Sequence, residues 1–175
     1  MSRNNEQNTE RFLKIFLSLG SNLGNRLNYL LKAGEMIKEK LSIQPFFGQS
    51  RIYETEAWGN INQEPFLNQI IELKTGIIDP FKVLVMCNQI ELKLGRNRIE
   101  KWGERTIDID LLFFGNLIIN EPNLIVPHPE IAKRKFILKP MVDLAPNFVH
   151  PVYQKTMVQL LSICLDNLSV NHYKN

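Results

Sequence analysis

The sequence predicts an α+β fold of the ferredoxin-like type, a βαββαβ sandwich on a mainly antiparallel sheet with helices on one face. Two observations support this prediction. Apolar residues recur with the period of a strand in four segments, and with the period of a helix in two segments between them. Turn and capping residues separate these segments in the order strand, helix, strand, strand, helix, strand. A hairpin and short helices follow, so we expect a single domain over residues 12–165.

The composition is that of an ordinary globular protein, with 44% hydrophobic and 22% charged residues among 175. The net charge of +3 is too small to indicate nucleic acid or a membrane as a partner, and no apolar run reaches the roughly 18 residues of a membrane span. Cys87 and Cys164 fit reduced, buried thiols in the cytosol. We expect a cytoplasmic monomer with a disordered tail over 1–11 and a fraying end over 166–175.

The first half of the chain supplies three strands and one helix. Phe12–Leu19 has the composition of a strand, and Asn25 is placed to cap the helix that follows. A strand is expected within Ile43–Tyr53, and another at Pro65–Leu73 with proline at its start, where a strand tolerates it. The turn Gly20–Asn25 resembles a phosphate loop only superficially, because the lysine of a Walker motif is missing. We interpret it as a tight turn, with a ligand-facing backbone as the alternative.

The second half begins with a helix that starts at Pro80 and stops at Gly95. Thr106–Phe114 follows as a strand, first alternating and then apolar at every position, which is typical of a central strand buried on both faces. Phe114–Ile119 has the pattern of a hairpin. Residues 140–165 are expected to form short helices.

The predicted central strand carries two carboxylates. Asp108 and Asp110 are two residues apart, so their side chains point to the same face, roughly 7 Å apart. Two carboxylates this close repel each other and are costly to bury, so a cation between them is expected. Mg²⁺ is the best candidate, since it is commonly held by one or two carboxylates and substrate phosphates. The alternative is a solvated edge strand, which the apolar run after Asp110 disfavours.

A basic cluster precedes these acids: Arg96, Arg98, Lys101 and Arg105. Guanidinium groups bind phosphate oxygens in a bidentate manner. Together, the acids and bases indicate a phosphate substrate and a metal ion, but they do not separate a kinase from a metal-dependent nuclease or phosphatase. An RNA-binding module of the same strand order is disfavoured, because two aspartates would repel a nucleic-acid backbone.

Six motifs in this order resemble the 6-hydroxymethyl-7,8-dihydropterin pyrophosphokinase family. They are G-S-N-L-G-N-R (20–26), Y-E-T (53–55), F-L-N (66–68), G-R-N-R (95–98), W-G-E-R-T-I-D-I-D (102–110) and V-P-H-P (126–129). The resemblance covers about residues 12–165, and W-G-x-R-x-x-D-x-D is its most specific part. It implies transfer of pyrophosphate from ATP to the pterin hydroxymethyl group in folate biosynthesis, with release of AMP and with two Mg²⁺ ions as cofactors.

The resemblance also implies a role for each matching position. Asp108 and Asp110 would hold the Mg²⁺ ions and, with Arg98 and Arg105, would form the catalytic set. The nucleotide would contact Asn88, Glu91, Arg96, Arg98, Trp102, Arg105, Ile109, His128 and Arg134. The pterin pocket would comprise Thr55, Glu56, Trp58, Phe66, Asn68, Trp102, Asp108 and Phe136, with Asn68 reading the edge of the ring and the aromatic residues stacking on it.

Some positions leave alternatives open. The family often has tyrosine at the position of Phe66 and proline at the position of Glu56, so a hydroxyl contact is lost and the shape of that loop is uncertain. Glu91 ends a helix, where the dipole disfavours an acid, so it either pairs with a loop arginine as support or serves the ligand. The loops 54–60 and 96–105 are expected to close over ATP.

Overall fold

The computed structural model describes residues 12–42, 47–56, 63–96 and 103–174. The helices are α1 (Arg26–Leu41), α2 (Pro80–Lys93), α3 (Lys135–Leu144) and α4 (Met157–Ser162). The strands are β1 (Leu13–Ser21), β2 (Phe47–Gln49), β3 (Tyr53–Thr55), β4 (Phe66–Thr75), β5 (Asp108–Phe114), β6 (Ile119–Glu121), β7 (Leu124–Val126) and β8 (Val170–His172).

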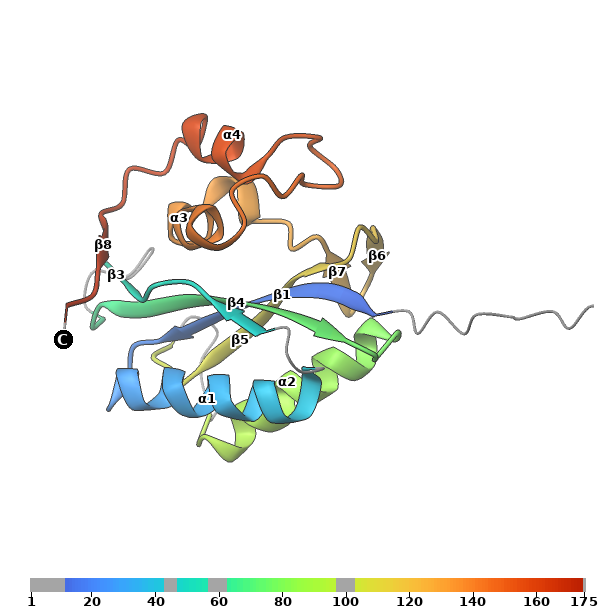
Figure 1. Ribbon diagram of the computed structural model, residues 1–175. Coiled ribbons are helices and arrows are strands. Elements are labelled where there is room, and N and C mark those ends of the chain that lie inside the picture. The colour runs from blue at the N-terminus through green and yellow to red at the C-terminus, as the bar shows by residue number, and fades with distance from the viewer. Residues whose placement is uncertain (1–11, 43–46, 57–62, 97–102, 175) are drawn as a thin grey trace, which may run out of the picture.

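The main sheet has six antiparallel strands in the order β5-β1-β4-β3-β8, with β2 also paired to β4 (Figure 1). The first strand of the chain lies between the last and the third strands of the βαββαβ core. This is the antiparallel α+β arrangement that the sequence predicts. The second predicted strand is divided into β2 and β3, which pair with different parts of β4.

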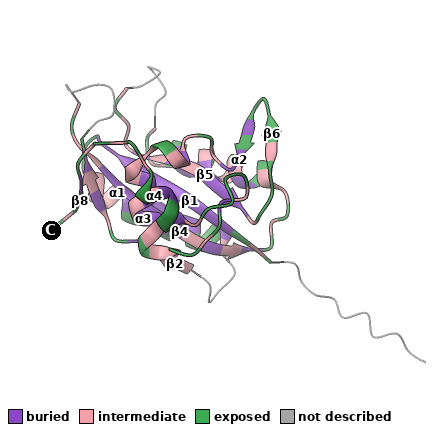
Figure 2. Ribbon diagram, turned by 90° about the horizontal axis from the view of Figure 1, so that it is seen from above, coloured by how far each residue is buried: buried purple, intermediate pink, exposed green. Residues whose placement is uncertain are grey.

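Helices cover both faces of the sheet, which corrects the expectation of helices on one face. In Figure 1, α1 and α2 lie below the sheet, and α3 and α4 lie above it. Each face has its own apolar core: Leu17 and Ile109 belong to the cluster that packs on α1 and α2, whereas Phe16 and Leu112 belong to the one that packs on α3 and α4. The strands β1, β4 and β5 between these layers are mostly buried (Figure 2). The C-terminal helices therefore complete a second layer.

Both predicted helix caps are present. The Asn25 side chain accepts a hydrogen bond from Asn28 N at 3.1 Å, and Asp79 Oδ1 accepts one from Phe81 N at 3.0 Å. Each cap satisfies an amide that the helix itself leaves without a partner. Gly95 ends the turn after α2 with φ +80°, a conformation that glycine adopts without strain.

Strand β5 lies at one end of the sheet, so its predicted central position is wrong. Its burial is nevertheless as expected, because Leu111 to Phe114 are all buried. A covered edge explains this: His128 N donates to Leu112 O at 3.0 Å, so the segment after β7 lies along β5. Sequence periodicity reports burial of the two faces and does not distinguish a central strand from a covered edge.

The C-terminal region differs from the prediction in two ways. The hairpin is formed by β6 and β7, downstream of the turn at Gly115, and not by 114–119. Residues 166–175 were expected to fray, yet β8 pairs with β3 in an antiparallel ladder, with Val170 opposite Thr55. Main-chain pairing of so short a segment depends on the neighbouring strand, which a local pattern does not reveal.

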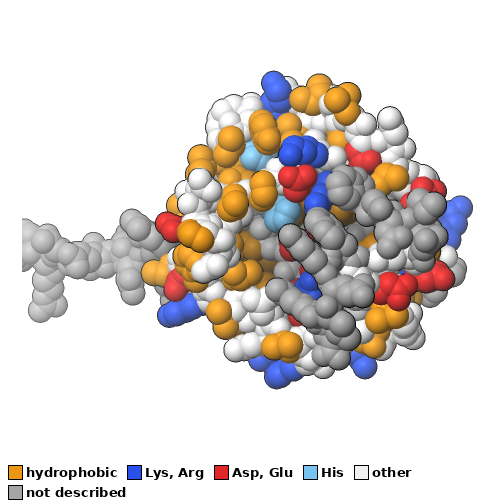
Figure 3. Space-filling view, turned by 180° about the vertical axis from the view of Figure 1, so that it is seen from behind, with side chains coloured by type: hydrophobic (Ala, Val, Ile, Leu, Met, Phe, Trp, Pro, Cys, Tyr) orange, Lys and Arg blue, Asp and Glu red, His pale blue; other side chains and the backbone are white. Residues whose placement is uncertain are grey.

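Charged side chains are scattered over the surface. On the face shown in Figure 3, basic groups lie among acidic ones rather than in one broad basic area. Among the described helices, none is both long and apolar enough to cross a bilayer. Cys87 is buried and Cys164 half-buried, and both are free thiols.

Candidate active site

A pocket of about 730 Å³, including its open mouth, lies on the face of the sheet that α3 partly covers. The strand register explains its position: Ser18 lies opposite Asp110, and Gly20 lies between Asp108 and Asn68 on the neighbouring strands. Residues opposite one another in antiparallel strands point to the same face. The pocket is lined by Ser18, Gly20, Thr55, Glu56, Gln63, Phe66, Asn68, Arg105, Asp108, Asp110, Arg134 and Phe136.

Asp108 is held by two arginines of the basic cluster. Arg105 Nη1 donates to Asp108 Oδ2 at 2.6 Å, and Arg96 Nη1 lies 2.5 Å from Asp108 Oδ1. All three side chains are mostly buried, so these charge-assisted contacts are stronger than those of exposed pairs. The predicted proximity to the acids is therefore found for Arg96 and Arg105.

Glu91 takes the structural role that the sequence left open. Its Oε1 accepts a hydrogen bond from Ile109 N at 2.7 Å and forms an ion pair with Arg96. The side chain is buried at the end of α2. A single carboxylate thus joins α2, the arginine and the backbone between Asp108 and Asp110. This contact fixes the start of β5 relative to the helix.

Asp110 is in a different electrostatic environment from Asp108. Burial raises the pKa of Asp110 to about 7, and the charges of Asp108 and Glu91 act in the same direction. Arg134 and Arg96 oppose the increase. The ionised form of Asp110 is therefore unfavourable in the protein alone, and a cation bound at this carboxylate would stabilise it.

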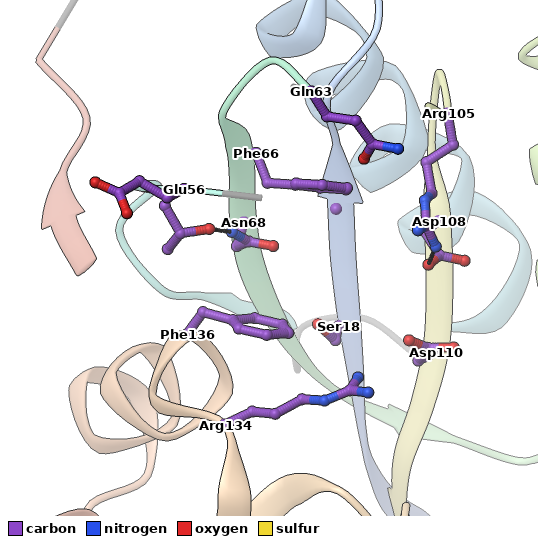
Figure 4. A pocket seen from close by; sticks show the side chains of 12 residues that line it. Ser18, Glu56, Gln63, Phe66, Asn68, Arg105, Asp108, Asp110, Arg134 and Phe136 are labelled. Carbon is purple, nitrogen blue, oxygen red and sulfur yellow. Dashed lines mark hydrogen bonds and ion pairs between the residues drawn. The ribbon is translucent and has the colours of Figure 1, made fainter. Parts of the chain in front are cut away.

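The other side of the pocket is aromatic with a polar edge. Figure 4 shows Phe66 of β4 and Phe136 of α3 at two levels of the pocket, with the Asn68 amide between these levels. Asn68 Nδ2 donates to Thr55 Oγ1 at 2.8 Å, and both side chains are buried. Gly20 leaves room for this amide, since a Cβ there would lie 3.3 Å from Asn68 Oδ1. A flat ring with hydrogen-bonding groups along one edge fits such a gap.

An arginine guanidinium lies close to each of the two aromatic rings. Arg105 Cζ lies 5.4 Å from the centre of the Phe66 ring, and Arg134 Cζ lies 5.7 Å from that of Phe136. These cation–π contacts place positive charge where the aromatic half of the pocket meets the two aspartates. The arrangement suits a ligand with a flat ring at one end and phosphates at the other.

The predicted site residues did not include Ser18, Gly20, Asn22 or Gln63, although a ligand-facing backbone was the alternative for the turn that begins at Gly20. Asn22 is fully buried and links the turn after β1 to the segment before β5: its N donates to Arg105 O at 3.1 Å, and its Oδ1 accepts from Arg105 N at 2.8 Å. Its Nδ2 donates to Gln63 Oε1 at 3.3 Å. The motif G-S-N-L-G contained the signal, because a glycine two residues after Ser18 on the same face marks a close approach of backbone and ligand.

Several other predicted residues do not line the pocket, and some lie outside the described residues. Asn88 is on α2, and Ile109 is a buried residue between the two aspartates. His128 lies near enough to Arg134 and Asp108 for their charges to act on it; burial, with Arg134, lowers its pKa. Glu56 lines the pocket, but its carboxylate points away from it (Figure 4). Arg98, Lys101, Trp58 and Trp102, and with them the centres of the two expected closing loops, lie outside the described residues.

The carboxylates present fit Mg²⁺. Among the described residues, no group of three or more histidine, cysteine, aspartate and glutamate side chains forms a metal cage. Asp108 and Asp110 provide hard oxygen ligands on one pocket wall. This donor set matches an ion that is completed by water and substrate phosphates rather than by the protein alone.

Comparison with known proteins identifies the family. Residues 16–146 match the family model for 7,8-dihydro-6-hydroxymethylpterin-pyrophosphokinase (HPPK). The chain belongs to the HPPK family. A 2-amino-4-hydroxy-6-hydroxymethyldihydropteridine pyrophosphokinase of Aquifex aeolicus is 41% identical over 143 residues, covering 82% of this chain and 87% of the relative. One from Bacillus subtilis is 40% identical, covering 74% of this chain and 76% of the relative.

Solved structures confirm the fold. The structure of Plasmodium falciparum HPPK-DHPS with pteroate aligns with a TM-score of 0.70 at 17% identity, covering 87% of this chain and 43% of that one. The wild-type Plasmodium structure with pterin and p-hydroxybenzoate aligns with a TM-score of 0.69 at 19% identity, covering 93% and 42%. This chain therefore matches less than half of each of those longer chains.

Membership of the family gives the chain its activity. It is an ATP-dependent diphosphokinase, a transferase that moves pyrophosphate from ATP to 6-hydroxymethyl-7,8-dihydropterin in folate biosynthesis. The activity that the sequence motifs indicate is thus confirmed.

Proposed function

We propose that this HPPK chain binds the pterin ring between Phe66 and Phe136 and carries out the transfer at Asp108 and Asp110. The observation that supports this assignment is that one pocket contains all four side chains, with the buried Asn68–Thr55 pair at its polar edge. The Asn68 amide selects the edge of the pterin by hydrogen bonding. The phenylalanine at position 66 retains the stacking surface of the tyrosine that the family often has.

Asp108 and Asp110 hold two Mg²⁺ ions in this proposal. Ions held by these two carboxylates would supply charge neutralisation for the triphosphate of ATP and for the attacking and leaving oxygens. Asp110 is suited to a metal because Arg134 and Arg96 compensate its charge only in part and its pKa stays raised. Asp108 is oriented by its ion pairs with Arg96 and Arg105.

The nucleotide lies on the β5 side of the pocket. Arg96, Arg105 and Arg134 supply positive charge there, and His128 adjoins them, which supports contacts to phosphate oxygens. Asn88, Glu91, Ile109, Arg98 and Trp102 remain predicted neighbours of the nucleotide, and Glu91 acts through the backbone of β5 and through Arg96.

The chemistry requires mainly positioning. Transfer of a pyrophosphoryl group needs the hydroxymethyl oxygen aligned with the β-phosphorus of ATP, and no covalent intermediate on the protein is needed. The hydroxymethyl group, attached to a ring held by Phe66, Phe136 and Asn68, then points toward the aspartates. Asp110 lines the pocket on the side to which the hydroxymethyl group points, so it is placed to assist removal of the hydroxyl proton. We further propose a cytoplasmic monomer without a nucleic-acid or membrane partner.

Product analysis tests the assignment against hydrolysis. The chain is incubated with ATP and Mg²⁺, with and without 6-hydroxymethyl-7,8-dihydropterin, and AMP, ADP and phosphate are followed separately. AMP that forms only with the pterin supports the proposal. ADP or phosphate released without the pterin would instead indicate a metal-dependent phosphohydrolase, the alternative that the acids and bases alone allow. An Asn68→Ala variant with an unchanged KM for the pterin would remove Asn68 from the site.

A further inference from the structure

The C-terminal residues 166–173 lie outside the segment that matches the HPPK family model, yet they contact both sides of the pocket. In Figure 1 this segment leaves α4, passes α3 and ends as β8 beside β3. We propose that it is a strap that holds the two walls of the pterin pocket in register and thereby sets the affinity for the pterin. This inference rests on the proposed function.

One end of the strap is attached to α3 beside Phe136. Lys135 N donates to Asp166 Oδ2 at 2.8 Å, and Leu168 N donates to Asp166 Oδ1 at 3.0 Å. Lys139 Nζ donates to Val170 O at 2.7 Å. Lys135 directly precedes Phe136, so the strap fixes the backbone that carries one aromatic wall.

The other end is attached to β3, which carries Thr55. Val170 pairs with Thr55, and His172 pairs with Tyr53, whose ring lies 4.5 Å from the imidazole ring. Tyr173 N donates to Ile52 O at 2.9 Å. Thr55 is the partner of the Asn68 amide, so the strap supports the residues that read the edge of the pterin.

The short length of β3 makes this support important. β3 has three residues, and β4 and β8 are its two ladder partners. Losing β8 would turn β3 into a sheet edge, where local opening is easier. A ligand that binds only the closed form loses apparent affinity in proportion to the population of that form. If β3 were closed about one fifth of the time, the KM for the pterin would rise about fivefold.

ATP should not respond in the same way. Asp108, Asp110 and Arg105 belong to β5 and the segment just before it, and β5 lies at the end of the sheet opposite to β8. Arg134 directly precedes Lys135 at the α3 end of the strap, so the difference between the two substrates is expected for loss of β8 and not for loss of the contact at Lys135. The strap therefore predicts that its loss raises the KM for the pterin but not the KM for ATP, which a general loss of stability would not produce. This difference distinguishes a positioning role from a purely structural one.

The test compares full-length Asn171→Pro with Lys174→Pro and the wild type. Asn171 lies in the middle of β8, where proline removes an N–H from the strand, whereas Lys174 lies beyond β8. We expect about a fivefold higher KM and Kd for the pterin in Asn171→Pro, with the KM for ATP and kcat within about twofold of wild type. Lys174→Pro should match the wild type. Hydrogen exchange at residues 53–55 should increase only in Asn171→Pro.

A second pair keeps the proposal testable if Asn171→Pro does not fold. Asp166→Ala removes the acceptor of Lys135 N on α3 and the acceptor of Leu168 N in the strap, whereas Asp166→Asn retains one amide oxygen. The KM for the pterin should therefore rise in Asp166→Ala and be partly restored in Asp166→Asn. An unchanged KM for the pterin in either Asn171→Pro or Asp166→Ala, or equal increases of the KM for pterin and for ATP in Asn171→Pro, would overturn the strap while wild-type activity upholds the proposed function. Absence of pterin-dependent AMP from the wild type would overturn both.

Discussion

Replacing Asp110 by asparagine should stabilise the protein while it abolishes activity. At an effective dielectric constant of about 20, two unit charges roughly 7 Å apart repel by about 2 kcal/mol. Asp108 exerts this repulsion on Asp110, and the charges of Arg134 and Arg96 offset part of it. Burial adds to this repulsion, and the rise of the Asp110 pKa from 3.8 to about 7 corresponds to about 4 kcal/mol. We therefore expect Asp110→Asn to raise the free energy of unfolding by about 2–4 kcal/mol at pH 8, and Tm by about 2–4 °C for each kcal/mol.

The stability that Asp110→Asn gains over the wild type should be larger at high pH than at low pH. The pKa of Asp110 in the folded state is raised to about 7, above the ordinary value of 3.8, so the folded state holds its proton over this interval. The contribution of Asp110 to wild-type stability is thus largest below pH 4, and this contribution is lost as the pH rises through 7. The difference between Asp110→Asn and the wild type should be small at pH 4 and full at pH 8.

The assay combines thermal unfolding in EDTA with turnover in Mg²⁺. Loss of a metal carboxylate should lower kcat by about 1000-fold or more, since such a ligand contributes several kcal/mol to stabilising the transition state. Asp108→Asn is the matched control: it should lose activity similarly but gain no stability, because Asp108 is paired with Arg96 and Arg105. A lower Tm for Asp110→Asn at pH 8, or retained turnover, would refute this reasoning.

Three further predictions follow from single contacts. Glu91→Ala leaves Ile109 N and Arg96 without their buried partner, so the free energy of unfolding measured in urea should fall by about 3 kcal/mol. The decrease should be smaller in Glu91→Gln, and equal decreases in the two variants would contradict a role for this contact. Asn68→Ala should raise the KM for the pterin about tenfold and leave that for ATP unchanged in steady-state kinetics; an increase for both would indicate general disruption. Burial lowers the pKa of His150 to about 4, so the unfolded state takes up a proton first as the pH falls. The free energy of unfolding of the wild type should therefore fall by up to about 1.4 kcal/mol per pH unit from pH 6.5 towards 4, whereas that of His150→Asn should lack this decrease. Identical pH profiles of stability for the two proteins would exclude this titration.

Much of the pocket was predictable from local sequence. The alternation around Asp108 and Asp110 predicted a shared face, and the structure puts both in one pocket. The resemblance to the family placed Phe66, Asn68 and Phe136 with them, although these residues lie on two different elements. The roles assigned to all these residues remain predictions for the experiments above.

Contacts between distant segments were not predictable in this way. Asn22 was missed because its function is to hold the backbone of Arg105, 83 residues away. The support given by Glu91 to Ile109 was left open, because a helix-terminal acid has the same local pattern whether it serves a ligand or the fold. Such roles depend on what lies opposite a side chain in space.

The sequence by itself determined the order of the core elements, their buried faces and the motifs that identify an HPPK, because periodicity, caps and short motifs are local properties of the chain. The tertiary structure alone decided that β5 is a covered edge, that helices lie on both faces and that β8 extends the sheet beyond β3. These features arise from pairing and packing between remote segments, whose free energy depends on the partner as much as on the segment itself. The proposed pterin pocket depends on both, because local motifs supply its residues and long-range contacts hold these residues in place.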